Sequence, residues 1–454
     1  MVVISHGSRT GGRLPPGPHR LTSEQVAADQ RQRLLDAMAQ LTGESGYAAT
    51  TVAEVIERAE VSRKTFYEHF EDRKSLLLAA FDASAPVALE EVRAASRRTG
   101  GPTRQIEALM RRLCRLAREN PSTIALSTIE IAAVDPAGLE RHDRLMGDYG
   151  GLIDECLSAG AKQPVPPSTL ARALAGGVHR TIDAYLHAKR GDELTALAPE
   201  LARWTRSYHP VPPGLTAGET PSPSWSWSCA GSDGLVGGRA PGTLMLALGG
   251  YQPSIGKQSR EFVHHSNRER ILDAVAQLIS AHGYTTLTAQ SIAEHADLSR
   301  RAFLAHFKNK DDAFASTVEI GHMKGQAIIE RARAGTPDWR TGVRNAIHAL
   351  LEFLASEPCF TRLAFVDAPL AGPAMTRRTH EHAGAYARLL LDEAPQRRQP
   401  PPIAPEAIVH GLFELAFHHA ASNKAAELPH VAPEAAYVAL APFVGATEAA
   451  EATA

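Results

Sequence analysis

The chain has few cysteines, no long apolar run and no surplus of one charge, and each absence excludes a class of protein. Its four cysteines stand far apart, so they form no CxxC motif, and reduced thiols are expected. No hydrophobic run approaches the roughly 20 residues that span a bilayer, and no apolar signal opens the chain. The cytoplasm is therefore the expected location. With a formal net charge of −2, any surface that binds nucleic acid must be local.

Motifs of catalysis and of metal binding are also missing. The sequence contains no P-loop, no dinucleotide-binding GxGxxG and no GxSxG nucleophile elbow. Three groups of neighbouring histidines lack the three- or four-residue spacing that metal ligands take on a helix; they are His264 with His265, His380 with His382, and His418 with His419. We therefore expect no enzyme, no metal and no cofactor.

An internal repeat is the feature that is present. Arg33–Tyr47 (RLLDAMAQLTGESGY) matches Arg270–Tyr284 (RILDAVAQLISAHGY) at a constant offset in residue number. The match continues without a gap from VSRKTFYEHF to LSRRAFLAHF. Between Arg33 and Phe70, 17 of 38 positions are identical. The chain is thus predicted to be a tandem duplication.

The stretches around the repeats differ in composition. Residues 209–262, between the copies, are rich in Pro, Gly and Ser and predict a linker. Behind each copy the apolar residues recur with helical spacing, and prolines fall between the helical segments; examples are Ile106, Leu109, Met110, Leu113 and Val343, Ile347, Leu350, Leu354. Alternation of the strand type is nearly absent. The predicted fold is all-α.

Each repeat has the pattern of a helix-turn-helix. In the first copy a helix with an apolar stripe ends at Gly46, and Thr51 with Glu54 forms a capping box for a second helix. After a turn at Glu60-Val61, Ser62 is placed to cap a third helix over Arg63–His69. Two short helices joined by such a turn are the DNA-binding arrangement.

The third helix is predicted to anchor through Phe66 and Phe70, which leaves its other residues outward. Arg63 and Lys64 can donate to guanine O6 and N7, and the methyl group of Thr65 can contact thymine. Tyr67, His69 and Arg73 are better placed for phosphates. The surplus of positive charge is small, so the fit of the helix to the groove must supplement charge.

These residues carry a family resemblance. Both runs resemble the N-terminal domain of the tetracycline-repressor (TetR) family, with Gly-Tyr before the threonines, a Val/Leu-Ser-Arg turn and a final His-Phe. The resemblance implies two TetR-like units, each a three-helix DNA-binding domain followed by a helical ligand-binding and dimerisation domain. The implied division is a disordered tail (1–23), DNA-binding domain (24–82), helical domain (83–208), linker (209–262), DNA-binding domain (263–319), helical domain (320–446) and short tail (447–454).

The resemblance also implies which residues lie at DNA. They are Thr51, Ser62, Arg63, Lys64, Thr65, Tyr67, His69 and Arg73 in the first copy, and Thr288, Ser299, Arg300, Arg301, His306 and Lys310 in the second. Leu304 replaces the tyrosine and Ala302 the threonine in the second copy. The second copy therefore either reads a different half-site or contributes mainly nonspecific affinity.

The expected function is that of a regulator, a repressor that leaves its operator when a small molecule binds. The alternative is a nucleoid-type scaffolding protein that binds DNA without an effector. The resemblance implies that units pair through their C-terminal helices, and the candidate pairing helices are Thr169–Lys189 and Pro405–Asn423. They form either a pseudo-dimer within one chain or a homodimer of whole chains.

Overall fold

The computed structural model contains only helices as regular elements in the part of the chain that it describes, so the predicted all-α fold is confirmed. None of these helices is long and apolar enough to cross a membrane. The described residues are 22–132, 134, 136–158, 168–211, 260–395 and 398–453. Most of the predicted linker and of the predicted N-terminal tail therefore lies outside them. Residues 447–453 of the predicted C-terminal tail are described and belong to a helix.

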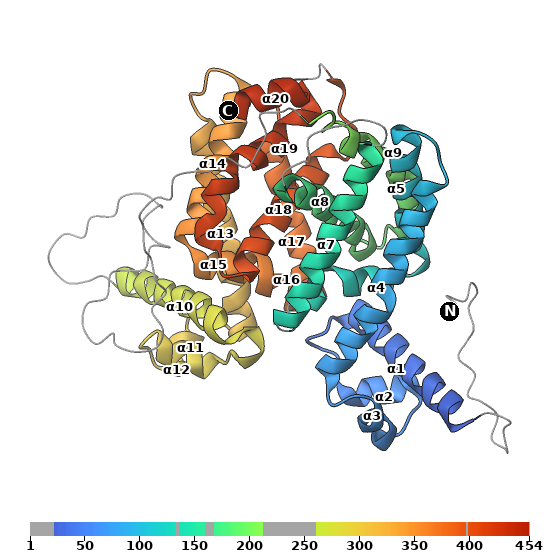
Figure 1. Cartoon of the computed structure of the whole chain (residues 1–454). Helices are drawn as coiled ribbons and strands as arrows, with labels where there is room; N and C mark the ends of the chain where they lie inside the picture. Colours follow the sequence, from blue (N-terminus) through green and yellow to red (C-terminus); the bar gives the residue numbers. More distant parts are fainter. Residues whose placement is uncertain are drawn as a thin grey trace.

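The first unit starts with a module of three helices and continues into a helical bundle (Figure 1). Its elements are α1 (Ser23–Ser45), α2 (Val52–Ala59), α3 (Arg63–His69), α4 (Arg73–Arg97), α5 (Pro102–Glu119), α6 (Pro121–Ala125), the π-helical turn η1 (Leu126–Glu130), α7 (Pro136–Leu157), α8 (Ser168–His187), η2 (Gly191–Glu193) and α9 (Leu194–Arg206).

The second unit repeats this order. Its elements are α10 (Arg260–His282), η4 (Tyr284–Thr286), α11 (Ala289–His295), α12 (Arg300–Leu304), α13 (Lys310–Arg333), α14 (Trp339–Ser356), α15 (Pro358–Arg362), the π-helical turn η5 (Leu363–Asp367), α16 (Ala368–Leu370), α17 (Pro373–Leu391), α18 (Ala404–Ala421), η7 (Ala425–Val431), α19 (Ala432–Val444) and α20 (Ala446–Thr453). The helix α10 begins just inside the predicted linker.

The structural repeat extends well beyond the motif that the sequence comparison used. The π-helical turns η1 and η5 are related by the same offset that relates Arg33 to Arg270, as are α5 and α14. From α8 onward the offset is slightly shorter, because Glu193-Leu194 and Ala198-Pro199-Glu200 recur as Glu427-Leu428 and Ala432-Pro433-Glu434. The duplication therefore includes the helical domain of each unit.

The two units meet through α8 and α18, which pack more extensively than any other helix pair in the described chain. These are the helices predicted to pair, and Figure 1 shows them at the centre of the molecule. Their backbones approach closely at two glycines. A Cβ atom on Gly177 would lie 2.6 Å from the Ala407 carbonyl oxygen, and one on Gly411 would lie 2.5 Å from that of Ala173. The reciprocal contacts relate the units by a pseudo-twofold axis.

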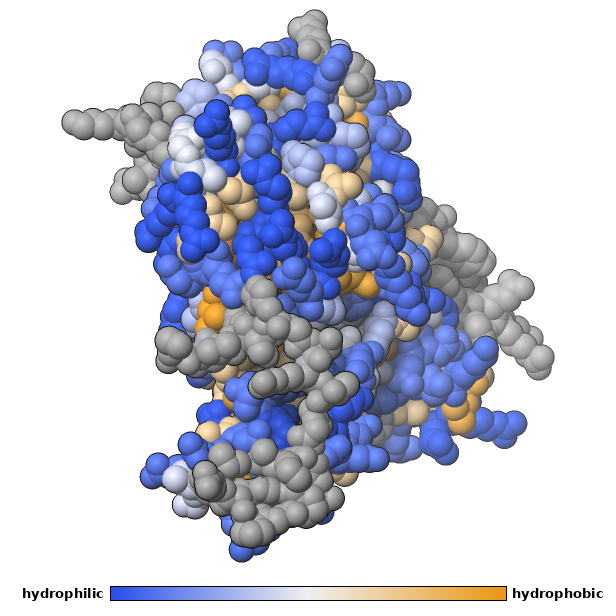
Figure 2. All heavy atoms as spheres, turned by 90° about the vertical axis from the view of Figure 1, so that its right-hand side faces the viewer, coloured by the Kyte–Doolittle hydropathy of each residue, from blue (hydrophilic) through white to orange (hydrophobic). Residues whose placement is uncertain are grey.

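Both three-helix modules lie at the same end of the molecule, the lower end in Figure 1. We call α1–α3 the first module and α10–α12 the second module. The face on the right-hand side of Figure 1 is mostly hydrophilic over its described residues, with apolar side chains in small separate groups (Figure 2). A permanent partner commonly buries a broader apolar surface than this.

Candidate nucleic-acid interface

Local capping positions the helices of the first module. The Thr51 hydroxyl accepts from the Glu54 amide at 3.2 Å, and the Glu54 carboxylate accepts from the Thr51 amide at 2.7 Å. Glu60 turns the chain with a φ of 51°, and the Ser62 hydroxyl accepts from the Thr65 amide at 3.0 Å. The predicted capping box and the predicted start of the third helix are therefore present.

The third helix of the first module presents a basic outer face. Phe66 is fully buried and anchors the helix. Arg63 and Lys64 are exposed, and the Tyr67 side chain beside them is 50 % exposed. The Arg63 guanidinium lies 5.8 Å from the Tyr67 ring centroid. The two cations and the phenol are thus available to a partner.

The remaining predicted contact residues differ in their availability. Thr51 and Ser62 are exposed, whereas Thr65 and His69 are half-buried. Arg73 turns back onto its own module: it donates to the Thr50 carbonyl oxygen, and its guanidinium lies 4.2 Å from the Tyr47 ring centroid. Arg73 therefore braces the start of α4, and its role at phosphates remains a prediction.

The second module uses the same supports. The Thr288 hydroxyl accepts from the Ser291 amide at 3.0 Å, and the Ser299 hydroxyl accepts from the Ala302 amide at 3.1 Å. Arg300 and Arg301 are exposed. Lys310 lies over the Tyr284 ring at 4.8 Å, as Arg73 lies over Tyr47.

The recognition helix of the second module is shorter and less polar. The helix α12 has five residues and α3 has seven. His69 is the last residue of α3, whereas His306, which the sequence aligns with it, lies beyond the end of α12. Leu304 is 47 % exposed at the position of Tyr67, so an apolar side chain replaces a hydroxyl donor there.

A buried ion pair joins the two units on the pseudo-twofold axis. Arg180 Nε donates to Glu414 Oε2 at 2.9 Å, and His142 Nε2 lies 3.0 Å from the other carboxylate oxygen. Burial raises the pKa of Glu414, but Arg180 and then His142 outweigh it and bring the pKa to about 2. The repeat aligns Arg180 with Glu414, so the two residues occupy equivalent positions in their units.

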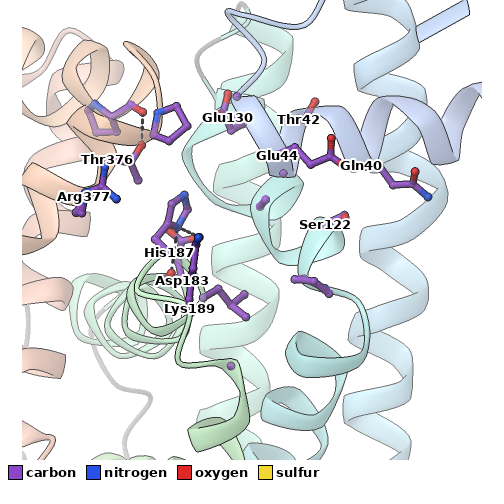
Figure 3. A pocket seen from close by; sticks show the side chains of 18 of the residues that line it. Gln40, Thr42, Glu44, Ser122, Glu130, Asp183, His187, Lys189, Thr376 and Arg377 are labelled. Atoms are coloured by element: carbon purple, nitrogen blue, oxygen red, sulfur yellow. Dashed lines mark hydrogen bonds and ion pairs between the residues drawn. The ribbon is translucent and has the colours of Figure 1, made fainter. Parts of the chain in front are cut away.

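A cavity of about 640 Å³ is lined by residues of both the first module and the core. Figure 3 shows its walls, with Asp183 and His187 from α8, Arg377 from α17 and Glu130 close to the loop after α1. Glu130 Oε2 accepts from the Tyr47 amide at 3.0 Å, and burial raises the pKa of Glu130 to about 7 against the opposing effect of this bond. The cavity wall is therefore connected directly to the first module.

One side-chain cluster beside this cavity was missed by the sequence prediction. Asp183, His187 and His380 offer ligand atoms within 4.8 Å of one another. The search for neighbouring histidines overlooked them because His380 comes from the other unit. Within α8 the four-residue spacing of Asp183 and His187 was a usable signal.

The comparison with protein families gives two matches in this chain. The model described as bacterial regulatory proteins, tetR family, matches residues 34–80 and 271–317. These ranges contain most of both modules. No curated protein matches the chain.

Three solved structures of regulators resemble part of the chain, each over 39 % of its length. The fatty acid degradation regulator FadR from Bacillus halodurans is 17 % identical over 94 % of its own chain, with a TM-score of 0.36. FadR from Bacillus subtilis, in complex with stearoyl-CoA, is 16 % identical over 97 %, with a TM-score of 0.35. A TetR family transcription regulator from Marinobacter aquaeolei VT8 is 19 % identical over 97 %, with a TM-score of 0.32. These likenesses carry no conclusion about this chain.

Proposed function

Because the chain is a DNA-binding transcription regulator of the tetR family with two DNA-binding domains in tandem, we propose that a single chain binds its operator as a pseudo-dimer. It acts as a repressor and leaves the operator when a small molecule binds. The observation that supports this proposal is the packing of α8 on α18, which brings both modules to one end of one molecule.

Charge at the axis favours pairing of a first unit with a second unit. If two first units met in the same way, Arg180 would face a second Arg180, and neither would find a carboxylate. If two second units met, Glu414 would face a second Glu414. A buried charge without its partner is strongly destabilising, typically by about 3–5 kcal/mol. Only the pairing of a first unit with a second unit gives both Arg180 and Glu414 an opposite charge. The ion pair therefore favours the observed arrangement and disfavours pairing of two identical units.

The two modules divide the work of recognition unequally. Arg63 and Lys64 contact base edges in the major groove, while Thr51, Tyr67 and His69 contact phosphates. Arg300 and Arg301 serve the second half-site, where α12 is shorter and Leu304 offers no hydrogen bond. The operator is therefore an imperfect palindrome or a pair of unlike half-sites.

The cavity between the first module and the core is the site proposed for the effector. A ligand that fits the cavity better in one position of the module than in another shifts the populations of the two positions. The ligand weakens operator binding, and the operator weakens ligand binding, by the same factor, because linkage is reciprocal.

Selection of binding sites from random DNA, followed by light scattering of the complex, tests the proposal. We expect one short asymmetric site and one chain of 48.7 kDa per site. A two-chain species as the sole DNA-binding form contradicts the pseudo-dimer. Coating of DNA without a preferred site contradicts the regulator and supports a scaffolding protein.

A further inference from the structure

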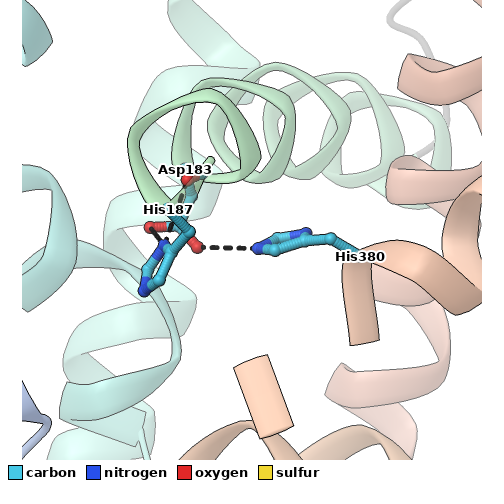
Figure 4. A group of neighbouring side chains, drawn as sticks. All are labelled: Asp183, His187 and His380. Carbon is cyan, nitrogen blue, oxygen red and sulfur yellow. Dashed lines mark hydrogen bonds and ion pairs between the residues drawn. The ribbon is translucent and has the colours of Figure 1, made fainter. Parts of the chain in front are cut away.

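Asp183, His187 and His380 bring a carboxylate and two imidazoles together where the two units meet (Figure 4). Asp183 is 4 % exposed. Its Oδ2 atom lies 3.4 Å from His380 Nε2, and its Oδ1 atom lies 3.3 Å from His187 Nδ1. Bonds of about 2.0–2.1 Å to a tetrahedral ion place neighbouring ligand atoms about 3.3 Å apart. Both carboxylate–imidazole separations match that value, and the three residues offer ligand atoms that all lie within 4.8 Å of one another.

His380 is oriented by further groups through its other ring nitrogen, as metal-bound histidines are. His380 Nδ1 lies 3.4 Å from His410 Nε2, and the other nitrogen of His410 lies 3.0 Å from the Thr181 hydroxyl. These contacts leave His380 Nε2 directed at the carboxylate. Asp183 Oδ1 and His380 Nε2 are buried and make no hydrogen bond in the described structure.

We propose that Asp183, His187 and His380 bind a divalent transition-metal ion, of which Zn²⁺ is the type, between the two units. Two imidazoles and one carboxylate form a donor set that suits Zn²⁺ and its neighbours better than Mg²⁺ or Ca²⁺. Asp183 and His187 also line the 640 Å³ cavity. The cavity gives the ion an approach from solvent and room for a fourth ligand.

The position related to this cluster by the pseudo-twofold axis has a different set of residues. The repeat aligns Asp143 with His380, at the equivalent position of α7. There the Arg172 guanidinium and His418 Nδ1 each lie 2.9 Å from Asp143 Oδ1. The guanidinium fills this second place with a permanent cation. The Asp183 carboxylate, by contrast, has only imidazoles as neighbours in this cluster, so an ion can bind to it.

The ion also bears on the first module, an effect that rests on the proposed function. Glu130, at the end of η1, lines the same cavity and holds the Tyr47 amide at 3.0 Å. A dication at the cluster attracts this carboxylate and competes with the amide for it. We expect binding of the ion to loosen the first module and to weaken operator binding. In the second unit the equivalent Asp367 lies 3.6 Å from Arg362 instead.

Titration of the full chain with Co²⁺, without DNA, tests the site. We expect one ion per chain, the visible absorption of low-symmetry Co²⁺, and displacement by Zn²⁺ but not by Mg²⁺. His187→Gln and His380→Gln each weaken binding at least tenfold, whereas His418→Gln leaves it unchanged. His187 is only half-buried at the cavity rim, so its variant remains informative if His380→Gln fails to fold. Absent Co²⁺ binding, or equal binding by all three variants, overturns the site and leaves a plain ion-pair cluster.

Operator affinity measured with Zn²⁺ and with a chelator tests the regulatory effect. We expect Zn²⁺ to weaken binding by at least about fivefold in the unaltered chain. Glu130→Gln abolishes this response while still binding Co²⁺, and Asp367→Asn preserves it. Equal affinity in both conditions overturns the regulatory effect but not the metal site. Failure to bind any DNA site in either condition contradicts the proposed function instead.

Discussion

The two units share the residues that hold their modules together and differ in the residues that those modules present. Arg33 donates to the Ala59 and Glu60 carbonyl oxygens, and Arg270 donates to that of Asp297, at equivalent positions. By contrast, Tyr67 corresponds to Leu304. After duplication the scaffold has been retained, while the surface predicted to contact DNA has diverged.

The face between the units shows the same divergence. The repeat aligns Arg180 with Glu414, His179 with Phe413 and Asp183 with Phe417. The first unit carries three polar groups where the second carries two aromatic rings and one acid. An interface between identical units would place the same residue at both equivalent positions. The unlike residues found here therefore make the two faces specific for each other.

Removing one partner of the buried pair gives the largest expected effect. Glu414→Ala leaves Arg180 and His142 without their carboxylate, and we expect a loss of about 3–5 kcal/mol in the free energy of unfolding. The double variant Arg180→Met/Glu414→Leu removes both charges and is expected to lose much less. Urea unfolding measures both. Equal losses in the single and double variants would show that the unpaired charge is not what destabilises the single variant.

The glycines test where the units have remained alike. Gly177→Ala and Gly411→Ala each force a Cβ atom against a carbonyl of the opposite helix. We expect each to lower the free energy of unfolding by about 1–3 kcal/mol. Gly147→Ala, whose added Cβ meets no neighbour within 4 Å, is the control. A Cβ atom on Gly177 also meets the Trp204 ring, whereas one on Gly411 meets only the Ala173 backbone. A small effect at Gly411 would therefore contradict the pseudo-twofold contact.

The modules are compared by removing their exposed cations. Arg63→Ala and Lys64→Ala are each expected to weaken specific operator binding by about 1–3 kcal/mol. Arg300→Ala and Arg301→Ala are expected to cost less, because α12 is shorter than α3 and presents Leu304 in place of a hydroxyl donor. Affinities on one selected operator, with circular dichroism to verify folding, measure the difference. Equal losses of affinity in the two modules would contradict their unequal contribution to operator binding.

A single hydroxyl gives the smallest expected effect. Tyr67→Leu makes the first module resemble the second and removes one hydrogen bond, which is worth about 0.5–1.5 kcal/mol of DNA affinity. Leu304→Tyr is the reciprocal change and should strengthen binding by a similar or smaller amount. Binding measured at several salt concentrations separates this effect from charge. Unchanged affinity in Tyr67→Leu would mean that the phenol does not contact DNA.

Local chemistry made much of the fold predictable. The caps at Thr51 and Ser62 follow from side chains that bond amides three residues away, and such signals are contained in short stretches of sequence. The pairing helices were predicted within a few residues because the repeat fixed where each must lie. The DNA contacts remain predictions.

What the sequence did not reveal depends on contacts between distant residues. His380 reaches Asp183 only because α17 packs against α8. The inward turn of Arg73 depends on the Tyr47 ring and the Thr50 carbonyl beneath it. The early end of α12 is hidden because His306 and His69 align without a gap in sequence. Each of these features belongs to tertiary packing, which periodicity and spacing do not record.

The contact between α8 and α18 has a consequence for the cell as well as for the molecule. Two separate subunits obey mass action, so dilution splits them when a regulator is present in only a few copies. Here both partners are made in one act of translation, always in equal number, and neither must search for the other. If one chain binds the operator as proposed, occupancy rises in proportion to the number of chains until the operator approaches saturation. A mutation in a homodimer changes both subunits, whereas here it changes only one unit. Each unit can therefore evolve separately toward its own half-site.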